Sequence, residues 1–189
     1  MSNNSNIHTP YPDDASWAGL FEMAETYEEQ EELPVYDNIE FFESPSAQDK
    51  QYDSPEEVLK ALFGYDSFRA GQKEVIDSIL AGRDAFAVMP TGAGKSVCYQ
   101  VPAMLLSGIT IVISPLISLM QDQVKSLNEA GVSAAFINSS LSEHAYFETV
   151  RKARQGVYKI IYVAPERLVT EGFFDLAENV KISMVTVDE

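Results

Sequence analysis

A glycine-rich turn at residues 91–96 constrains this chain more than any other feature. The stretch FAVMPTGAGKSVCYQVPA (residues 86–103) is an apolar run that breaks into Thr-Gly-Ala-Gly-Lys-Ser and then continues in a helix-like pattern. Glycine at 92 and 94 removes side chains that would hold backbone N–H groups away from a phosphate. A lysine at a helix start opposes the helix dipole unless an anion lies there. The turn predicts a phosphate site, with a plain strand-to-helix connector as the alternative.

Side chains at this turn supply the other groups that a nucleoside triphosphate needs. Lys95 can reach the β- and γ-phosphates, and the hydroxyl of Ser96 can ligate Mg²⁺. The usual pattern G-x-x-x-x-G-K-[ST] has glycine where this chain has Met89. We therefore expect ATP and Mg²⁺ as ligands, with one departure from the usual pattern. The backbone expected to surround the phosphates comes from Thr91, Gly92, Ala93 and Gly94.

Short apolar runs alternate with helical patterns on both sides of this turn. The expected strands are residues 85–89, 109–114, 134–138, 159–164 and 182–187. Apolar, β-branched strands separated by helices are typical of a parallel sheet covered on both faces. The ordered part is therefore predicted to be α/β, a parallel sheet in a three-layer arrangement.

Helical periodicity fills the segments between the expected strands. Ser54-Pro55-Glu56-Glu57 has the form of a capping box, with serine at the N-cap and glutamate three residues later. The helices that follow it are expected to end at Gly64 and Gly82, because glycine suits the residue after a helix. A later helix at 116–131 is expected to turn these side chains inward: Leu116, Leu119, Met120, Val124 and Leu127.

The charge of the chain is concentrated at its start. The net charge is −16, and residues 1–50 hold 12 acidic residues and one lysine, whereas residues 51–189 hold 17 acidic and 12 basic residues. We predict a mostly disordered acidic tail over 1–50 and an ordered lobe over 51–189. Trp17, Leu20 and Phe21 lie at helical spacing within the tail. They indicate either a helix that docks on a protein partner or a solvated tail with incidental aromatic residues.

Composition also bears on where the chain works. The single cysteine, Cys98, excludes a disulfide within the chain and favours a reducing compartment. No apolar run reaches the roughly 18 residues of a membrane span, and the first residues lack a secretory pattern. We expect no membrane partner. Net charge decides nothing about nucleic acid here, because it concerns solubility and partners rather than fold.

Five segments between residues 58 and 189, about 70% of the chain, resemble the RecQ-type branch of superfamily 2 DNA helicases in order and spacing. The phosphate loop of that family typically begins Met-Pro-Thr-Gly, which accounts for Met89. The resemblance implies the first RecA-like lobe of a helicase motor, truncated at its carboxyl end. The matching segments are LFGYDSFRAGQKEVI, MPTGAGKSVCYQVPA, VISPLISLMQDQV, YVAPERL and VDE.

The first of these segments resembles the family's adenine-reading motif. The resemblance implies that Gln72 meets the adenine edge through its carboxamide, and that Tyr65 and Arg69 flank the base by stacking and cation–π contact. Without the resemblance, Tyr65 and Phe68 would be interpreted as residues that pack the turn between two helices.

Two further segments resemble those that grip the backbone of single-stranded DNA. Ser114 and Leu116 lie where a strand gives way to a helix, so free amides are expected to meet phosphates there. Arg167 adds positive charge, or pairs with Glu166 at the surface. We expect little preference for base identity.

The closing acids complete the implied site. In the family's acid box, Asp188 holds Mg²⁺ and Glu189 orients and deprotonates the attacking water, which makes Lys95, Asp188 and Glu189 the expected catalytic residues. The alternative is a solvated strand end.

The resemblance implies an ATP-dependent DNA helicase that moves 3′ to 5′ in recombination and repair, on single-stranded or forked DNA. Its compartment would be the cytoplasm and nucleoid of a bacterium, or the nucleus of a eukaryote. Residues 1–189 hold one lobe, so we expect them to bind ATP without unwinding DNA. One alternative is a nucleotide-responsive interaction protein that recruits a partner through its tail. Another is a P-loop kinase or small-molecule ATPase.

Overall fold

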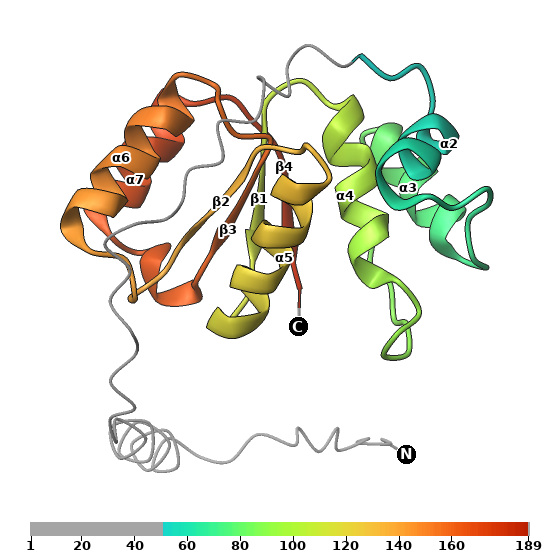
Figure 1. Ribbon diagram of the computed structural model, residues 1–189, viewed down its shortest axis with the longest axis horizontal. Helices are drawn as coiled ribbons and strands as arrows, with labels where there is room; N and C mark the ends of the chain where they lie inside the picture. The colour runs from blue at the N-terminus through green and yellow to red at the C-terminus, as the bar shows by residue number, and fades with distance from the viewer. Residues whose placement is uncertain (1–50, 189) are drawn as a thin grey trace, which may run out of the picture. The chain divides into compact units, whose positions relative to one another are not determined.

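The computed structural model describes residues 51–188, in which four parallel strands form one sheet (Figure 1). The strands are β1 (Ile109–Ile113), β2 (Ala134–Ile137), β3 (Ile160–Val163) and β4 (Ile182–Val187), in the spatial order β2-β3-β1-β4. Strands β1, β3 and β4 are rich in branched residues, which suit a pleated surface, and β2 (Ala-Ala-Phe-Ile) is apolar throughout. The predicted parallel sheet is confirmed.

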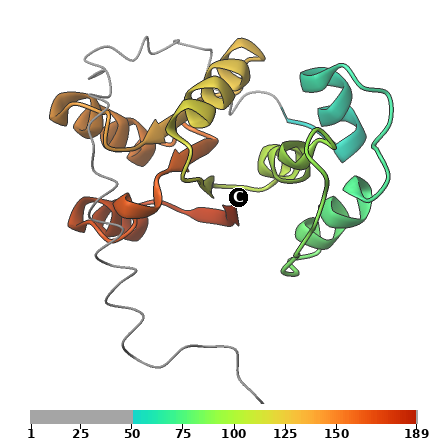
Figure 2. The same cartoon turned by 90° about the horizontal axis from the view of Figure 1, so that it is seen from below.

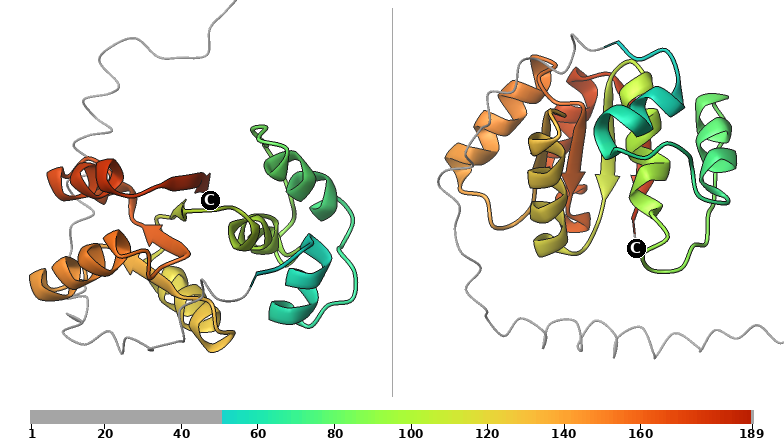
Figure 3. Two further views of the ribbon diagram at one scale, coloured as in Figure 1. Left: turned by 90° about the horizontal axis from the view of Figure 1, so that it is seen from above. Right: turned by 45° about the vertical axis from the view of Figure 1, so that its right-hand side comes forward.

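Helices connect the strands and flank the sheet. They are α2 (Pro55–Val58), which continues as a π-helical turn over Leu59–Phe63, α3 (Gln72–Leu80), α4 (Lys95–Leu105), α5 (Ile117–Glu129), α6 (Glu143–Arg154) and α7 (Glu171–Asn179). A 3₁₀ turn, Pro165–Arg167, follows β3. Helices α2 and α3 pack on α4 rather than on the sheet (Figures 2 and 3).

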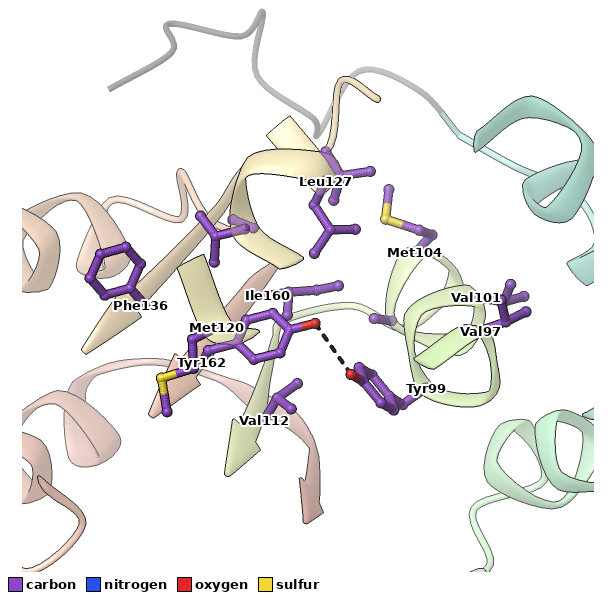
Figure 4. Packing of buried hydrophobic residues seen from close by; sticks show 14 of the residues in the cluster. Val97, Tyr99, Val101, Met104, Val112, Met120, Leu127, Phe136, Ile160 and Tyr162 are labelled. Atoms are coloured by element: carbon purple, nitrogen blue, oxygen red, sulfur yellow. Dashed lines mark hydrogen bonds between the residues drawn. The ribbon is translucent and has the colours of Figure 1, made fainter. Parts of the chain in front are cut away.

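Alternate residues of the strands enter two separate cores. Val112, Ile160 and Tyr162 pack with α4 and α5 on one face (Figure 4). Ile111 and Ile161 pack with α6 and α7 on the other face. Because successive strand side chains point to opposite faces, this division is the expected result of a doubly covered sheet. The three-layer prediction is confirmed.

The predicted capping box at the first helix is present. The hydroxyl of Ser54 accepts a hydrogen bond from the backbone N–H of Glu57 at 3.2 Å, and the Glu57 carboxylate accepts one from the N–H of Asp53 at 2.8 Å. The π-helical turn that follows ends at Gly64 with φ of 71°, as the glycine indicated.

The prediction of a strand at residues 85–89 is wrong. This segment has no regular structure, and Phe86 and Val88 are 94% and 86% exposed. In the part of the chain that the structure describes, β4 is bonded to β1 and to no other strand. An apolar run becomes a strand only where a neighbour supplies hydrogen bonds, and residues 85–89 have none.

The inward position predicted for Leu116 is also wrong. Leu116 is the extended residue that precedes α5, and it is 45% exposed. Met120, Val124 and Leu127 are buried as predicted, and Leu119 is half-buried. The helix begins one residue later than its apolar pattern, so Leu116 lies outside the regular face.

No helix in the span from 51 to 188 has the length and apolar content needed to cross a bilayer. The predictions for residues 1–50, including the partner helix at Trp17, Leu20 and Phe21, lie outside the described residues. Glu189 also lies outside them.

Candidate nucleotide site

A cleft of about 420 Å³ gathers most of the residues predicted to bind nucleotide. It lies where α4 begins and β4 ends, at the carboxyl edge of the parallel sheet, which is the usual ligand edge of such folds. The predicted residues that line it are Tyr65, Arg69, Gln72, Thr91, Gly92, Gly94, Lys95, Ser96 and Asp188. Ala93 belongs to the same loop but is not among the lining residues.

The phosphate loop is a tight turn that leads directly into α4. The N–H of Ala93 donates to the carbonyl of Pro90 at 3.1 Å, and Gly94 forms the N-cap of α4 with φ of 84°. The positive end of the α4 dipole and its first-turn residues, Lys95 and Ser96, therefore face the cleft. Met89 packs against this helix, with its sulfur 3.8 Å from the sulfur of Cys98.

Gln72 braces the phosphate loop from α3. Its side chain is only 3% exposed, and its Nε2 donates to the carbonyls of Ala93 at 3.2 Å and Gly94 at 3.0 Å. Its Oε1 accepts from the N–H of Arg69 at 2.8 Å, and Nη1 of Arg69 donates to the carbonyl of Gly92 at 2.6 Å. Sequence reasoning missed this bracing role. The adenine role of Gln72 stays a prediction.

The aromatic residues of the adenine motif separate in the structure. Tyr65 is exposed and lines the cleft, so it does not merely pack the turn between the helices. Phe68 is half-buried and packs against the core formed with α4 and α5. The packing interpretation therefore fits Phe68, and Tyr65 keeps a face for stacking.

Asp188 is held at the end of β4 by two contacts. Its N–H donates to the carbonyl of Ile113 at 2.8 Å, which extends the pairing of β1 and β4 by one residue. Its Oδ2 accepts from the hydroxyl of Tyr99 at 2.9 Å. Burial raises the pKa of the Tyr99 phenol far above its usual value, so the hydroxyl keeps its proton and donates it.

Sequence reasoning missed Tyr99, although a signal was present. Tyr99 follows Lys95 by four residues in α4, so both side chains lie on one face of the helix. The helix face that carries Lys95, the predicted phosphate-binding residue, therefore also carries the hydroxyl that contacts Asp188.

The cleft fits Mg²⁺ chemistry through a small set of protein oxygens. Ser96 supplies a hydroxyl and Asp188 a carboxylate, and both line the same cleft. Mg²⁺ is usually bound through one or two carboxylates together with substrate phosphates and water. Residues 51–188 contain no group of three or more His, Cys, Asp or Glu side chains that could hold a metal without a nucleotide.

The predicted DNA-contact residues lie at the same edge of the sheet. Ser114 directly follows β1, but its N–H donates to the carbonyl of Val163 at 3.2 Å, so this amide already has a partner on β3. The Ser114 hydroxyl accepts from the N–H of Leu116 at a long 3.5 Å. Arg167 follows β3, and no ion pair joins it to Glu166 within the described residues. The DNA roles stay predictions.

Comparison with known proteins identifies the chain's relatives. The family model described as DEAD/DEAH box helicase matches residues 69–189. An ATP-dependent DNA helicase RecQ of Pasteurella multocida (strain Pm70) is 49% identical over 133 residues, which is 70% of this chain and 21% of that protein. The RecQ helicase of Bacillus subtilis (strain 168) is 47% identical over 133 residues, 70% of this chain and 22% of that protein.

A plant relative gives the same picture. The ATP-dependent DNA helicase Q-like 5 of Arabidopsis thaliana is 46% identical over 133 residues, 70% of this chain and 14% of that protein. The chain thus matches about a fifth or less of the length of each of these three proteins. The family model covers well over half of the chain. With the phosphate loop, Asp188 and the parallel sheet in the expected places, the chain belongs to the DEAD/DEAH box helicase family and, within it, is of the RecQ type.

Proposed function

We propose that this chain is the ATP-binding lobe of a RecQ-type, ATP-dependent DNA helicase. The observation that carries the proposal is the single cleft in which the phosphate loop, Tyr65, Arg69 and Asp188 line one space. The names of the relatives, all ATP-dependent DNA helicases, agree with this chemistry.

In this proposal each group in the cleft has one task. The loop amides and Lys95 bind the phosphates, which places the γ-phosphate toward Asp188. Ser96 and Asp188 hold Mg²⁺, which supplies charge neutralisation on the phosphate oxygens. Glu189 would accept the proton of the attacking water. Tyr65 and Arg69 pack against the adenine, and Gln72 keeps the loop in its shape.

DNA would contact the carboxyl edge of the sheet next to the nucleotide. Ser114, Leu116 and Arg167 follow the neighbouring strands β1 and β3, so one single strand can pass over all three. Exposed Leu116 suits contact with sugar or base surfaces, whereas Arg167 suits a phosphate. Movement from 3′ to 5′, action on forked DNA, and a role in recombination and repair are proposed from the RecQ type.

The lobe by itself is proposed to bind ATP and not to unwind DNA. Residues 51–188 contain one sheet and therefore one wall of the nucleotide cleft. Phosphoryl transfer needs positive charge on the far side of the γ-phosphate as well, and a motor needs a second body to move against.

Calorimetric titration of residues 1–189 with Mg·ATP tests the nucleotide site. The wild-type protein should bind, and Lys95→Ala should weaken binding about tenfold or more, because a charged hydrogen bond to phosphate is lost. Lys125→Ala, which removes an exposed lysine from α5, is the matched control and should bind as wild type does. Equal affinities for Lys95→Ala and wild type would refute the site.

Strand separation tests the second half of the proposal. A forked duplex with a 3′ single-stranded tail should remain intact with residues 1–189 and Mg·ATP. Unwinding that Lys95→Ala abolishes would show that one lobe is sufficient. Retention of single-stranded DNA should fall with Arg167→Ala and with rising salt, because phosphate contacts release counterions.

A further inference from the structure

A chain of hydrogen bonds runs from α5 through the core to Asp188. Nε2 of Gln100 donates to Oε1 of Gln123 at 3.0 Å and to the hydroxyl of Tyr162 at 3.2 Å. The hydroxyls of Tyr162 and Tyr99 lie 3.3 Å apart and face each other (Figure 4), and Tyr99 lies 2.9 Å from Oδ2 of Asp188. The four contacts join α5, α4, β3 and the end of β4.

The number of protons on each group determines which partner donates in each of these hydrogen bonds. An ionised carboxylate can only accept, so Tyr99 must give its single proton to Asp188. Tyr162 must then donate to Tyr99, and it receives a hydrogen bond from Gln100. The Gln100 amide has two protons, and the second goes to Gln123. The bonds from Gln100 to Tyr162, from Tyr162 to Tyr99 and from Tyr99 to Asp188 all donate toward Asp188, so these three polarise one another in the same sense. The bond from Gln100 to Gln123 runs the other way and anchors Gln100 to α5.

Burial indicates that these polar groups serve more than packing. Tyr99, Gln100 and Tyr162 are all buried, and the two tyrosines belong to the apolar core that α4 and α5 share with the sheet. Phenylalanine would fill the same space without polar atoms that require partners. The buried hydroxyls therefore indicate a functional role. The series of hydrogen bonds that contains them ends at Asp188, which lines the nucleotide cleft.

We propose that Tyr99 and Tyr162 are positioning residues that hold the carboxylate of Asp188 for the nucleotide-bound Mg²⁺, and that Gln100 and Gln123 tie this carboxylate to α5. The proposal rests on the proposed function of the cleft. A hydrogen bond to one oxygen of a carboxylate fixes the orientation of the other oxygen, which is then available for a metal. Hydrogen-bond partners of metal ligands generally act in this way. Gln123 lines the same cleft, and its helix begins directly after the proposed DNA contact at Leu116.

The Mg²⁺ requirement of nucleotide binding measures this positioning directly. ADP is titrated by calorimetry into residues 1–189 at a series of Mg²⁺ concentrations and also in EDTA. Tyr99→Phe should raise the Mg²⁺ concentration for half-maximal enhancement about tenfold, because outer partners of metal ligands typically contribute that much. Tyr162→Phe, which keeps the Tyr99–Asp188 bond but removes its support, should raise it about threefold. Binding in EDTA should not change in either variant.

A matched control separates positioning from general loss of a buried hydroxyl. Tyr158→Phe removes a phenol that is buried near the opposite end of β3, so its Mg²⁺ requirement should equal that of the wild type. In an Asp188→Asn background, Tyr99→Phe should have no further effect, because the carboxylate it positions is absent.

Each other result has a definite meaning. A Tyr99→Phe protein that binds ADP with the wild-type Mg²⁺ requirement overturns the inference. If Tyr99→Phe also loses binding in EDTA and its melting temperature falls, its folding is damaged. The Mg²⁺ requirement of Tyr162→Phe then tests the inference, and a wild-type value overturns it. A wild-type protein that binds no ADP under any condition overturns the proposed function and this inference with it. A wild-type protein that binds while all Tyr variants match it overturns the inference alone.

Discussion

Two apolar segments of similar length behave in opposite ways in this molecule. Residues 109–113 form β1, which is bonded to β3 on one side and β4 on the other and is largely buried. Residues 85–89 have the same kind of apolar side chains, but they form no strand, and Phe86 and Val88 are almost fully exposed. The difference teaches that pairing partners, and not local composition, decide which apolar run becomes a strand.

The two edges of the sheet also differ, because β2 is buried throughout whereas β4 is partly exposed. Among residues 51–188, β4 has a partner strand on one side only, and Val185 and Val187 are 59% and 73% exposed. β3, with partners on both sides, is buried throughout. A cleft of about 640 Å³ is lined by residues 85–89 and by the last residues of β4, so the two under-paired segments face a common space.

Shortening one side chain in each segment should reveal the largest difference in stability between residues 109–113 and residues 85–89. Ile111→Ala in β1 should lower the free energy of unfolding by about 3 kcal/mol, because it leaves a cavity in a packed core. Val88→Ala should change it by less than about 0.5 kcal/mol, because Val88 is exposed. Denaturant unfolding of both variants measures this, and equal losses would mean that residues 85–89 are packed in solution.

The loop that follows the exposed segment should be far less tolerant than the segment itself. Gly94→Ala should cost about 1–3 kcal/mol and abolish ATP binding, since φ is 84° and a Cβ would lie 2.5 Å from Nε2 of Gln72. Gly82→Ala is the control, with φ of 71° and open space around the added carbon. Calorimetry should find ATP affinity unchanged in Gly82→Ala; normal affinity in Gly94→Ala would contradict the tight fit.

Alkaline pH should destabilise the folded protein through the buried phenol of Tyr158, just before β3. Burial raises the pKa of Tyr158 above its usual value of 10.0. The unfolded chain therefore releases this proton near pH 10 while the folded protein keeps it, so stability present below pH 10 is lost as pH rises. Between pH 8 and pH 11, wild type should lose about 1 kcal/mol more than Tyr158→Phe in denaturant unfolding. Parallel losses in the two proteins would show that this phenol titrates normally.

The smallest effect is expected where the exposed segment becomes polar. Phe86→Ser should alter the free energy of unfolding by less than about 0.5 kcal/mol, because the Phe86 side chain is already exposed and its loss removes little buried apolar area. It should nevertheless reduce self-association in sedimentation at high protein concentration, since exposed apolar surface next to an open strand edge favours association. A large loss of stability would place Phe86 in a packed environment.

Local sequence was sufficient for parts of the molecule whose partners are close in the chain. Ser54 and Glu57 cap one helix within a single turn, and Gly94 sits where the loop needs positive φ. Short apolar runs separated by helical patterns predicted four of the strands and their parallel arrangement. The strand at residues 85–89 was predicted from the same pattern and failed, because a strand's neighbour is a long-range property that composition does not contain.

The candidate site divides in the same way. Lys95, Ser96 and Asp188 were placed by their motifs, and the cleft brings them together. The hydrogen bonds from Tyr99 to Asp188 and from Gln72 to the loop cross 89 and 21–22 positions of sequence. The spacing of Lys95 and Tyr99 in α4 places Tyr99 on the helix face that carries Lys95, but the sequence does not show which distant residue it contacts. Leu116 was assigned inward by periodicity, which cannot tell a helical residue from the extended residue just before the helix.

The strand order has a consequence for how the chain can fold during synthesis. β1 is made first but pairs with β3 and β4, and Thr110 meets Ile160 fifty positions later. β2 is made next, yet it is bonded to β3 and not to β1. No strand pair of this sheet can therefore form on the ribosome until β3 has emerged. The nascent chain must hold its apolar runs in helices or collapsed states until then, and folding should be slow because its first sheet contacts are long-range.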